Sequence, residues 1–216
     1  MSKYILLLLT LCQIISCSDK DNTKNITGEI KNNAKIKQRP TNDLVSKEGV
    51  LLQLKSKKAI LDNLKAQKKL ELEVLVKEPN KDKLTLVINE QWPEEVETTF
   101  NIWKNSEGKV IVVGEYPFSE SGDWDIEYLH YFNKKGKIFS FERNTHFFNS
   151  ICTEGVAHEA IVEFYDTDLK KIDRKYNLVD EAKKELKKEN CVMNYDFAYV
   201  VNHNLKNYLK KINYRS

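Results

Sequence analysis

Apolar and polar residues alternate along most of the middle of the chain. Leu70, Leu72, Val74 and Val76 are separated by Glu71, Glu73 and Leu75, a period of two that is typical of a half-buried strand. The same alternation recurs in about eight short segments, at 70–77, 84–88, 96–102, 110–113, 124–132, 138–143, 155–165 and 172–176. Turn residues between successive members predict hairpins, and hence a mostly antiparallel meander.

The hairpin over 124–143 carries most of the candidate binding chemistry. Alternation places Trp124 and Tyr128 on one face of the strand and Tyr131 on the other. If one face is core, an aromatic surface on the other is a candidate site for a hydrophobic ligand, a glycan or a protein strand. Core packing of these three rings is the alternative. A two-residue loop would place His130 opposite Phe139.

The spacing of apolar residues changes to a helical one at both ends of this region. Leucines at three- and seven-residue spacings predict a helix over about 45–68, with Ser46 as its cap. Asp180 is a suitable cap for a helix over 181–188, and residues 197–212 have the clearest amphipathic pattern. The fold class is therefore α+β: a meander of about eight strands with one helix before it and two after it, in a single domain over 45–216.

The last of these helices has two possible roles. Its apolar face can cover the open face of the sheet, as the sheet requires. Its lysines, Lys206, Lys210 and Lys211, also allow a helix that lies on a membrane surface. The first role is the expected one.

A basic start and a short apolar run occupy residues 1–16, the pattern of a secretory signal peptide. The run of about 12 residues is shorter than the roughly 20 of a membrane-spanning helix. It ends in Ile14-Ile15-Ser16-Cys17, which resembles the lipobox of bacterial lipoproteins. The resemblance implies cleavage before Cys17 and acylation of this residue, and hence a lipid anchor in the outer membrane of the cell envelope.

Residues 17–44 follow as a polar tether, which cannot bury enough apolar surface to order itself. Ser18-Asp19-Lys20-Asp21 resembles the surface-export signal of some Gram-negative lipoproteins. A domain that faces the periplasm is the alternative to surface display.

Two cysteines remain in the expected mature domain. Cys152 and Cys191 would lie in an oxidising compartment, where a disulfide between them would close a loop of about 40 residues. Two separate buried thiols are the alternative. The formal charge of +3 is spread over the chain without a basic stripe, so a nucleic acid is not an expected partner.

No recognised catalytic or metal motif occurs in the sequence. The four histidines, His130, His146, His158 and His203, form no ligand-spaced pair, although His146 and His158 could meet across neighbouring strands. Cys152 would need one of them as a base to act as a nucleophile. We therefore expect no catalytic residues, no cofactor and no metal.

The expected function is a non-enzymatic lipoprotein that binds another protein or scaffolds an assembly. A carrier of lipids or other hydrophobic ligands is the alternative, and it requires a continuous apolar concavity. An envelope hydrolase is a further alternative, and it requires His146 or His158 to converge with Cys152 or a carboxylate in a cleft.

Overall fold

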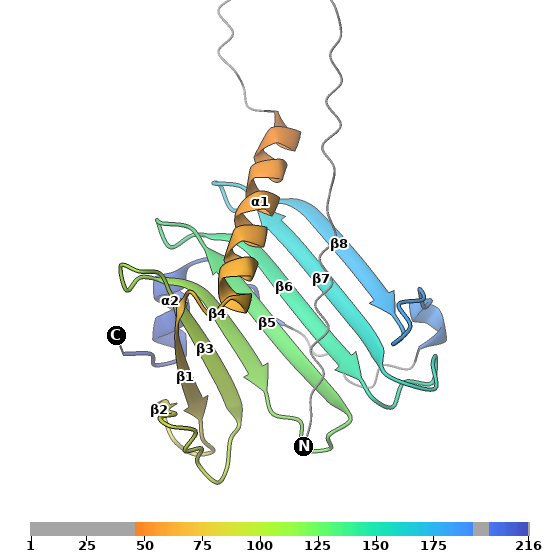
Figure 1. Cartoon of the computed structure of the whole chain (residues 1–216), viewed down its shortest axis with the longest axis horizontal. Helices are drawn as coiled ribbons and strands as arrows, with labels where there is room; N and C mark the ends of the chain where they lie inside the picture. Colours follow the sequence, from red (N-terminus) through yellow and green to blue (C-terminus); the bar gives the residue numbers. More distant parts are fainter. Residues whose placement is uncertain (1–45, 192–198, 216) are drawn as a thin grey trace, which may run out of the picture. The chain divides into compact units, whose positions relative to one another are not determined.

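The computed structural model describes residues 46–191 and 199–215 of the 216-residue chain. These residues form an α+β fold built on one eight-stranded antiparallel sheet (Figure 1). The elements in chain order are α1 (Lys47–Ala66), β1 (Glu71–Lys77), β2 (Thr85–Leu86), β3 (Thr98–Lys104), β4 (Val110–Pro117), β5 (Trp124–Phe132), β6 (Ile138–Phe147), β7 (Ala157–Tyr165), β8 (Lys171–Val179), a 3-10 turn (Lys188–Asn190) and α2 (Leu205–Lys211). No helix among the described residues is long and apolar enough to cross a membrane.

The strands follow one another in the sheet as the alternating pattern predicts. Their order is β2-β1-β3-β4-β5-β6-β7-β8, so that only the two-residue β2 departs from sequence order, at the outer edge of β1. Each neighbouring pair is antiparallel. The expected meander is therefore confirmed.

Three of the hairpins are closed by the same local device. Asn105, Asn133 and Asp166 each accept two backbone N–H groups in the turn, from residues two and four positions further on. Each of these hairpins also has a register shift where its strands meet the turn. Such Asx turns and bulges tie the register of a hairpin to its loop.

The turn chemistry corrects one detail of the expected register. The loop of the β5–β6 hairpin is longer than two residues and ends in a bulge, so His130 pairs with Phe141 and not with Phe139. In the same register, His146 pairs with Asp125.

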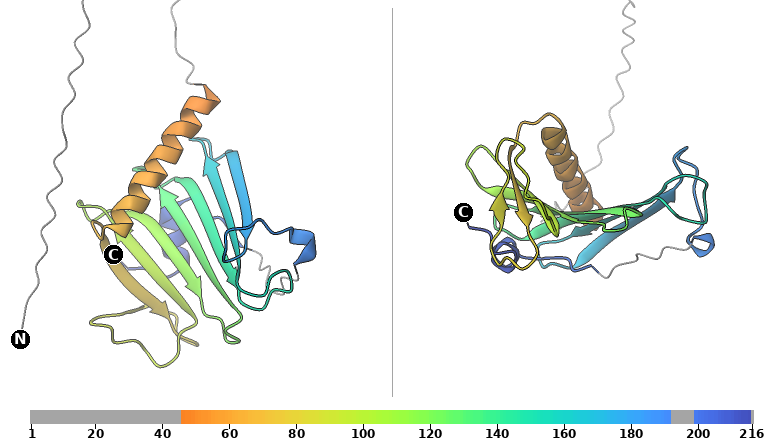
Figure 2. Two further views of the ribbon diagram at one scale, coloured as in Figure 1. Left: turned by 45° about the vertical axis from the view of Figure 1, so that its right-hand side comes forward. Right: turned by 90° about the horizontal axis from the view of Figure 1, so that it is seen from below.

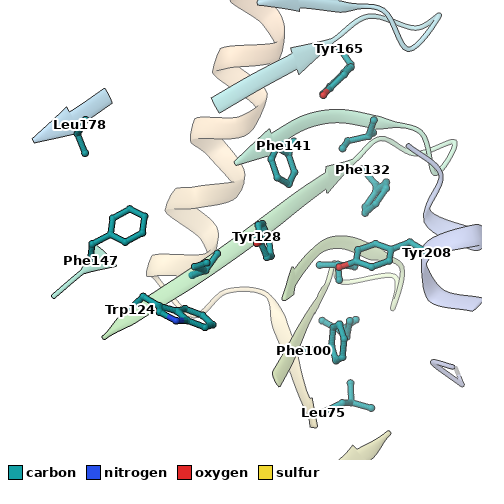
Figure 3. Close-up of a cluster of buried hydrophobic side chains, with 14 of the residues drawn as sticks. Leu75, Phe100, Trp124, Tyr128, Phe132, Phe141, Phe147, Tyr165, Leu178 and Tyr208 are labelled. Atoms are coloured by element: carbon teal, nitrogen blue, oxygen red, sulfur yellow. The ribbon is translucent and has the colours of Figure 1, made fainter. Parts of the chain in front are cut away.

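Both faces of the sheet are apolar in part, and a different segment covers each. Figure 2 shows α1 on one side of the sheet and α2 on the other. We call these the α1 face and the α2 face. The main core cluster lies on the α2 face (Figure 3) and includes Leu75, Phe100, Ile102, Val113, Trp124, Ile126, Tyr128, Phe132, Ile138, Phe141, Phe147, Ala157, Tyr165, Leu178 and Tyr208.

Helix α1 begins at the predicted cap, where the Ser46 hydroxyl accepts the Gly49 N–H. Its Leu54 and Leu61 pack against a smaller cluster on the α1 face, which contains Trp103, Val112, Leu129, Tyr131 and Phe139. Lys58 interrupts the leucine stripe because it pairs with Glu142 on β6 and with Asp62, 2.8 Å away. Helix α1 therefore contacts the sheet through polar as well as apolar side chains.

The expected helix over 181–188 does not form. Asp180 instead closes a turn, in which its carboxylate accepts the Lys184 N–H at 2.9 Å and Lys183 has a φ of 65°. This left-handed residue is incompatible with a continuing α-helix. The chain then runs back along β8, with a hydrogen bond from Leu186 to Leu178 at 2.9 Å.

The last predicted helix is shorter than the pattern over 197–212. Asn204 caps α2, and the described residues before it are not helical. His203 and Leu205 bond to the β5–β6 turn through backbone hydrogen bonds with Ile138 and Gly136. Residues 197 and 198 lie outside the described residues. The expected covering role is nevertheless confirmed, because Tyr208 is buried and packs with the core of the sheet.

The main core cluster predicts a large difference between a buried and an exposed substitution. Phe141 has no exposed surface, whereas Leu52 on α1 is 70% exposed. Replacing Phe141 by Ala should lower the free energy of unfolding by about 3–5 kcal/mol. Leu52→Ala should change it by less than about 0.5 kcal/mol. Chemical denaturation of both variants tests this, and equal effects would contradict the placement of the core.

Candidate functional site

The two cysteines of the expected domain form a disulfide, Cys152–Cys191. It joins the loop between β6 and β7 to the end of the 3-10 turn, and both cysteines pack against the main core cluster. Cys152 therefore has no thiol with which to act as a nucleophile, and the thiol form of the hydrolase hypothesis is wrong for this state. Cys17, the expected lipidation site, lies outside the described residues.

The three aromatic residues selected from the sequence are all buried. Trp124 and Tyr128 are 8% exposed and lie in the main core cluster (Figure 3). Tyr131 has no exposed surface, lies on the α1 face, and donates a hydrogen bond to Asp62 at 2.6 Å. The structure therefore separates these three rings and packs each of them as core, which was the alternative drawn from the sequence.

Other aromatic residues of the middle region are exposed. Trp92 is 53% exposed in the segment between β2 and β3, and Phe118 is 61% exposed directly after β4. The sequence carried one signal for this exposure. Both rings lie next to a proline and outside the alternating segments, in Trp92-Pro93 and Pro117-Phe118.

Phe118 lines a hollow of about 510 Å³ beside the start of β3 and the end of β4. The other lining residues are Pro79, Glu94, Glu95, Val96, Glu97 and Glu120. A backbone hydrogen bond of 3.0 Å from Phe118 to Glu97 joins the two loops that form the hollow. Lys77 pairs with Glu97 at 2.7 Å. We call this feature the acidic hollow, because four of its seven lining residues are glutamates.

Two of the smaller cavities beside the C-terminal segment share part of their lining. One of about 160 Å³ is lined by Glu115, Tyr128, His130, Tyr199, Val200, Asn202 and Lys211. The other, of about 240 Å³, is lined by Lys77, Asp82, Leu84, Glu97, Thr98, Phe100, Glu115, Lys211, Ile212 and Asn213. Both contain Glu115 and Lys211, and Tyr208 on α2 donates to Glu115 at 2.6 Å. Neither cavity is a purely apolar chamber.

His130 is the least exposed titratable group of the smaller cavity. It is 1% exposed among the rings of Phe132, Phe141 and Tyr208, whose centroids lie 4.7–6.3 Å from its own. The Nδ2 of Asn202 lies 3.5 Å from the Nε2 of His130. The Nδ1 of His130 has no hydrogen-bond partner among the described residues. Burial lowers the pKa of His130 to about 3, so the ring is neutral at physiological pH.

The structure brings together two histidines that the sequence left as a possible pair. His146 on β6 and His158 on β7 are directly opposite in the register, and their ring centroids are 4.7 Å apart. Asp125 on β5 contacts the Nδ1 of His146 at 2.9 Å. His130 and His203 do not join them in any metal-ligand group, and no cluster of three or more potential ligands occurs in the described part of the chain.

Comparison with known proteins provides no relative: the chain matches no protein-family model, no curated protein and no solved structure. The functional argument therefore rests on the geometry above.

The buried neutral His130 predicts loss of stability in acid. The unfolded chain binds a proton at this residue below a pKa of about 6.5, whereas the folded chain does so only near 3. Stability is thus complete above pH 6.5 and falls as the pH decreases toward 3, by about 2 kcal/mol at pH 5.

A His130→Gln variant removes this titration and should lose about 2 kcal/mol less between pH 7.5 and pH 5 in denaturant-unfolding experiments. The pKa of His158 is also lowered, by burial first and then by His146, and it acts in the same direction in both proteins. The difference between the two pH profiles therefore isolates His130. Parallel profiles would show that His130 is accessible to protons in the folded state.

Proposed function

We propose that this chain is a lipid-anchored protein of the bacterial cell envelope, and that its sheet domain binds a basic segment of another protein. The proposed anchor is Cys17, the last residue of the lipobox-like Ile14-Ile15-Ser16-Cys17. The Cys152–Cys191 disulfide supports an exported location, because such bonds persist in oxidising compartments and are rare in the bacterial cytosol.

The observation that carries the binding role is the exposure of two aromatic rings: Phe118, which lines the acidic hollow, and Trp92, two residues before its Glu94. Ile88 and Leu86, which precede Trp92 along the chain, are 56% and 46% exposed. Large apolar side chains that gather at one place on a surface mark interaction sites, and aromatic residues dominate the energy of many interfaces. Fold stability gives no reason to expose these rings.

The charge of the hollow indicates the chemistry of the partner. No ion pair to Glu94, Glu95 or Glu120 occurs among the residues that the structure describes, so their charges are available to a ligand. A lysine- or arginine-rich segment would complement these carboxylates and speed the encounter. Apolar groups of the same segment would cover Trp92 and Phe118.

The two alternative functions have less support. A lipid carrier needs a continuous apolar concavity, whereas the cavities described above are all lined in part by charged side chains. A hydrolase that uses Cys152 lacks a free thiol. Membrane attachment through the C-terminal helix is also less favoured, because the apolar residues of α2 pack against the sheet.

The lipid anchor is tested by metabolic labelling. Cells that express the native chain should incorporate labelled palmitate into it, and Cys17→Ser should abolish the labelling. Cys12→Ser is the matched control and should be labelled like the native chain. Label in the Cys17→Ser protein would refute the anchor. Protease treatment of intact cells then separates a surface-displayed domain, which is cleaved, from a periplasmic one, which is protected.

The binding surface is tested by photo-crosslinking in the native envelope. A photoreactive phenylalanine analogue at Trp92 should give an adduct with one protein, and the same analogue at Leu52, exposed on α1, should not. A Glu94→Gln, Glu95→Gln, Glu120→Gln triple variant should reduce the adduct by about tenfold or more, since it removes the charge but keeps the shape. The cross-linked peptide of the partner should be rich in lysine or arginine.

Three outcomes would overturn the binding proposal: no adduct at Trp92, an adduct with lipid alone, or a yield that the triple variant leaves unchanged. The palmitate result is independent of all three, so the anchor and the binding surface can fail separately.

A further inference from the structure

His146 and His158 form a cross-strand pair on the α1 face of the sheet. They occupy opposite positions on β6 and β7, and opposite residues on neighbouring antiparallel strands project from the same face. The His146 side chain is 40% exposed, so the pair is accessible to solvent. Neither histidine belongs to the acidic hollow or to the cavities on the α2 face.

The distance between the two rings fits the binding of one metal ion. Two imidazole nitrogens at about 2.0–2.1 Å from a tetrahedral ion place their ring centres about 5 Å apart. The observed centroid separation is 4.7 Å. The two rings are nearly perpendicular, at 79°.

Asp125 supplies the outer-shell contact that metal-binding histidines usually have. Its carboxylate lies 2.9 Å from the Nδ1 of His146, and a proton held there leaves Nε2 with its lone pair free. The carboxylate also fixes the orientation of the ring. This arrangement of carboxylate, histidine and open nitrogen is typical of metal sites in proteins.

Charged side chains lie near His158 and would also act on a bound cation. Burial lowers the pKa of His158, and the nearby His146 and Lys183 lower it further. Glu181 and Asp125 act in the opposite direction and are the negative charges next to the pair. The charge of Lys183 opposes a cation and limits the affinity.

We propose that His146 and His158 bind one divalent late transition-metal ion, with Asp125 as the positioning residue and water in the other coordination positions. Imidazole ligands suit copper, nickel and zinc, and the general order of affinities places Cu²⁺ first. With two protein ligands the ion is exchangeable. This distinguishes the site from a structural zinc centre, which uses four protein ligands.

Calorimetric titration of the purified, tag-free full chain in detergent with Cu²⁺, Ni²⁺ and Zn²⁺ tests the site. The expected result is one ion per chain, with Cu²⁺ bound most tightly. His146→Gln and His158→Gln should each weaken Cu²⁺ binding by more than the roughly 10–100-fold typical of losing an outer-shell partner. Asp125→Asn should fall within that range. His203→Gln removes an exposed histidine elsewhere and should have no effect.

A spectroscopic readout separates a metal ligand from a residue that only supports the fold. The electron paramagnetic resonance spectrum of the Cu²⁺-loaded chain should show coupling to two imidazole nitrogens, and to one in either glutamine variant. The circular dichroism of the metal-free variants should match that of the native chain. Unchanged affinity in both glutamine variants, or unchanged nitrogen coupling, would overturn the proposal. So would a loss of binding in His203→Gln equal to that in the other two.

Discussion

The sheet buries apolar side chains on both of its faces, and most other features of the structure depend on this constraint. An open sheet in water must cover each apolar face with another segment. The described chain uses the segment before the sheet for one face and the segment after it for the other. The order of the elements in the sequence is thus their order in space: α1 covers one face, the sheet lies in the middle, and the C-terminal segment covers the other face (Figure 2).

Both covers are held by polar contacts in addition to apolar packing. On the α1 face, Lys58 pairs with Glu142 and Asp62 accepts a hydrogen bond from Tyr131. On the α2 face, Tyr208 donates to Glu115 at the boundary between two cavities. A partly buried polar group needs its partner, because an unpaired one costs about 1–3 kcal/mol. These contacts therefore specify where α1 and the C-terminal segment lie on the sheet. They also place charged side chains in the lining of the cavities beside the C-terminal segment.

The candidate sites lie where the covers do not reach. The acidic hollow is built from loops at the start of β3 and the end of β4, and three of its four glutamates lie outside the alternating segments. The His146–His158 pair instead lies within the sheet, where register alone decides which side chains meet. The Asx turn and bulge that close the β5–β6 hairpin set the register that brings Asp125 opposite His146, so turn chemistry determines one contact of this distant pair.

The sequence by itself determined the local structure. A period of two predicted the strands and their hairpins, the Ser46 cap predicted the start of α1, and two remaining cysteines predicted the disulfide. The strands and the cap follow from the preferences of a residue and its neighbours in the chain, and the disulfide follows from the number of cysteines in an exported domain. Only the tertiary structure decided that Trp124, Tyr128 and Tyr131 are core while Trp92 and Phe118 are exposed, because alternation assigns a face but not what covers it. It also replaced the helix at 181–188 by a turn that runs back along β8, since pairing with a strand edge outweighs a modest helical preference.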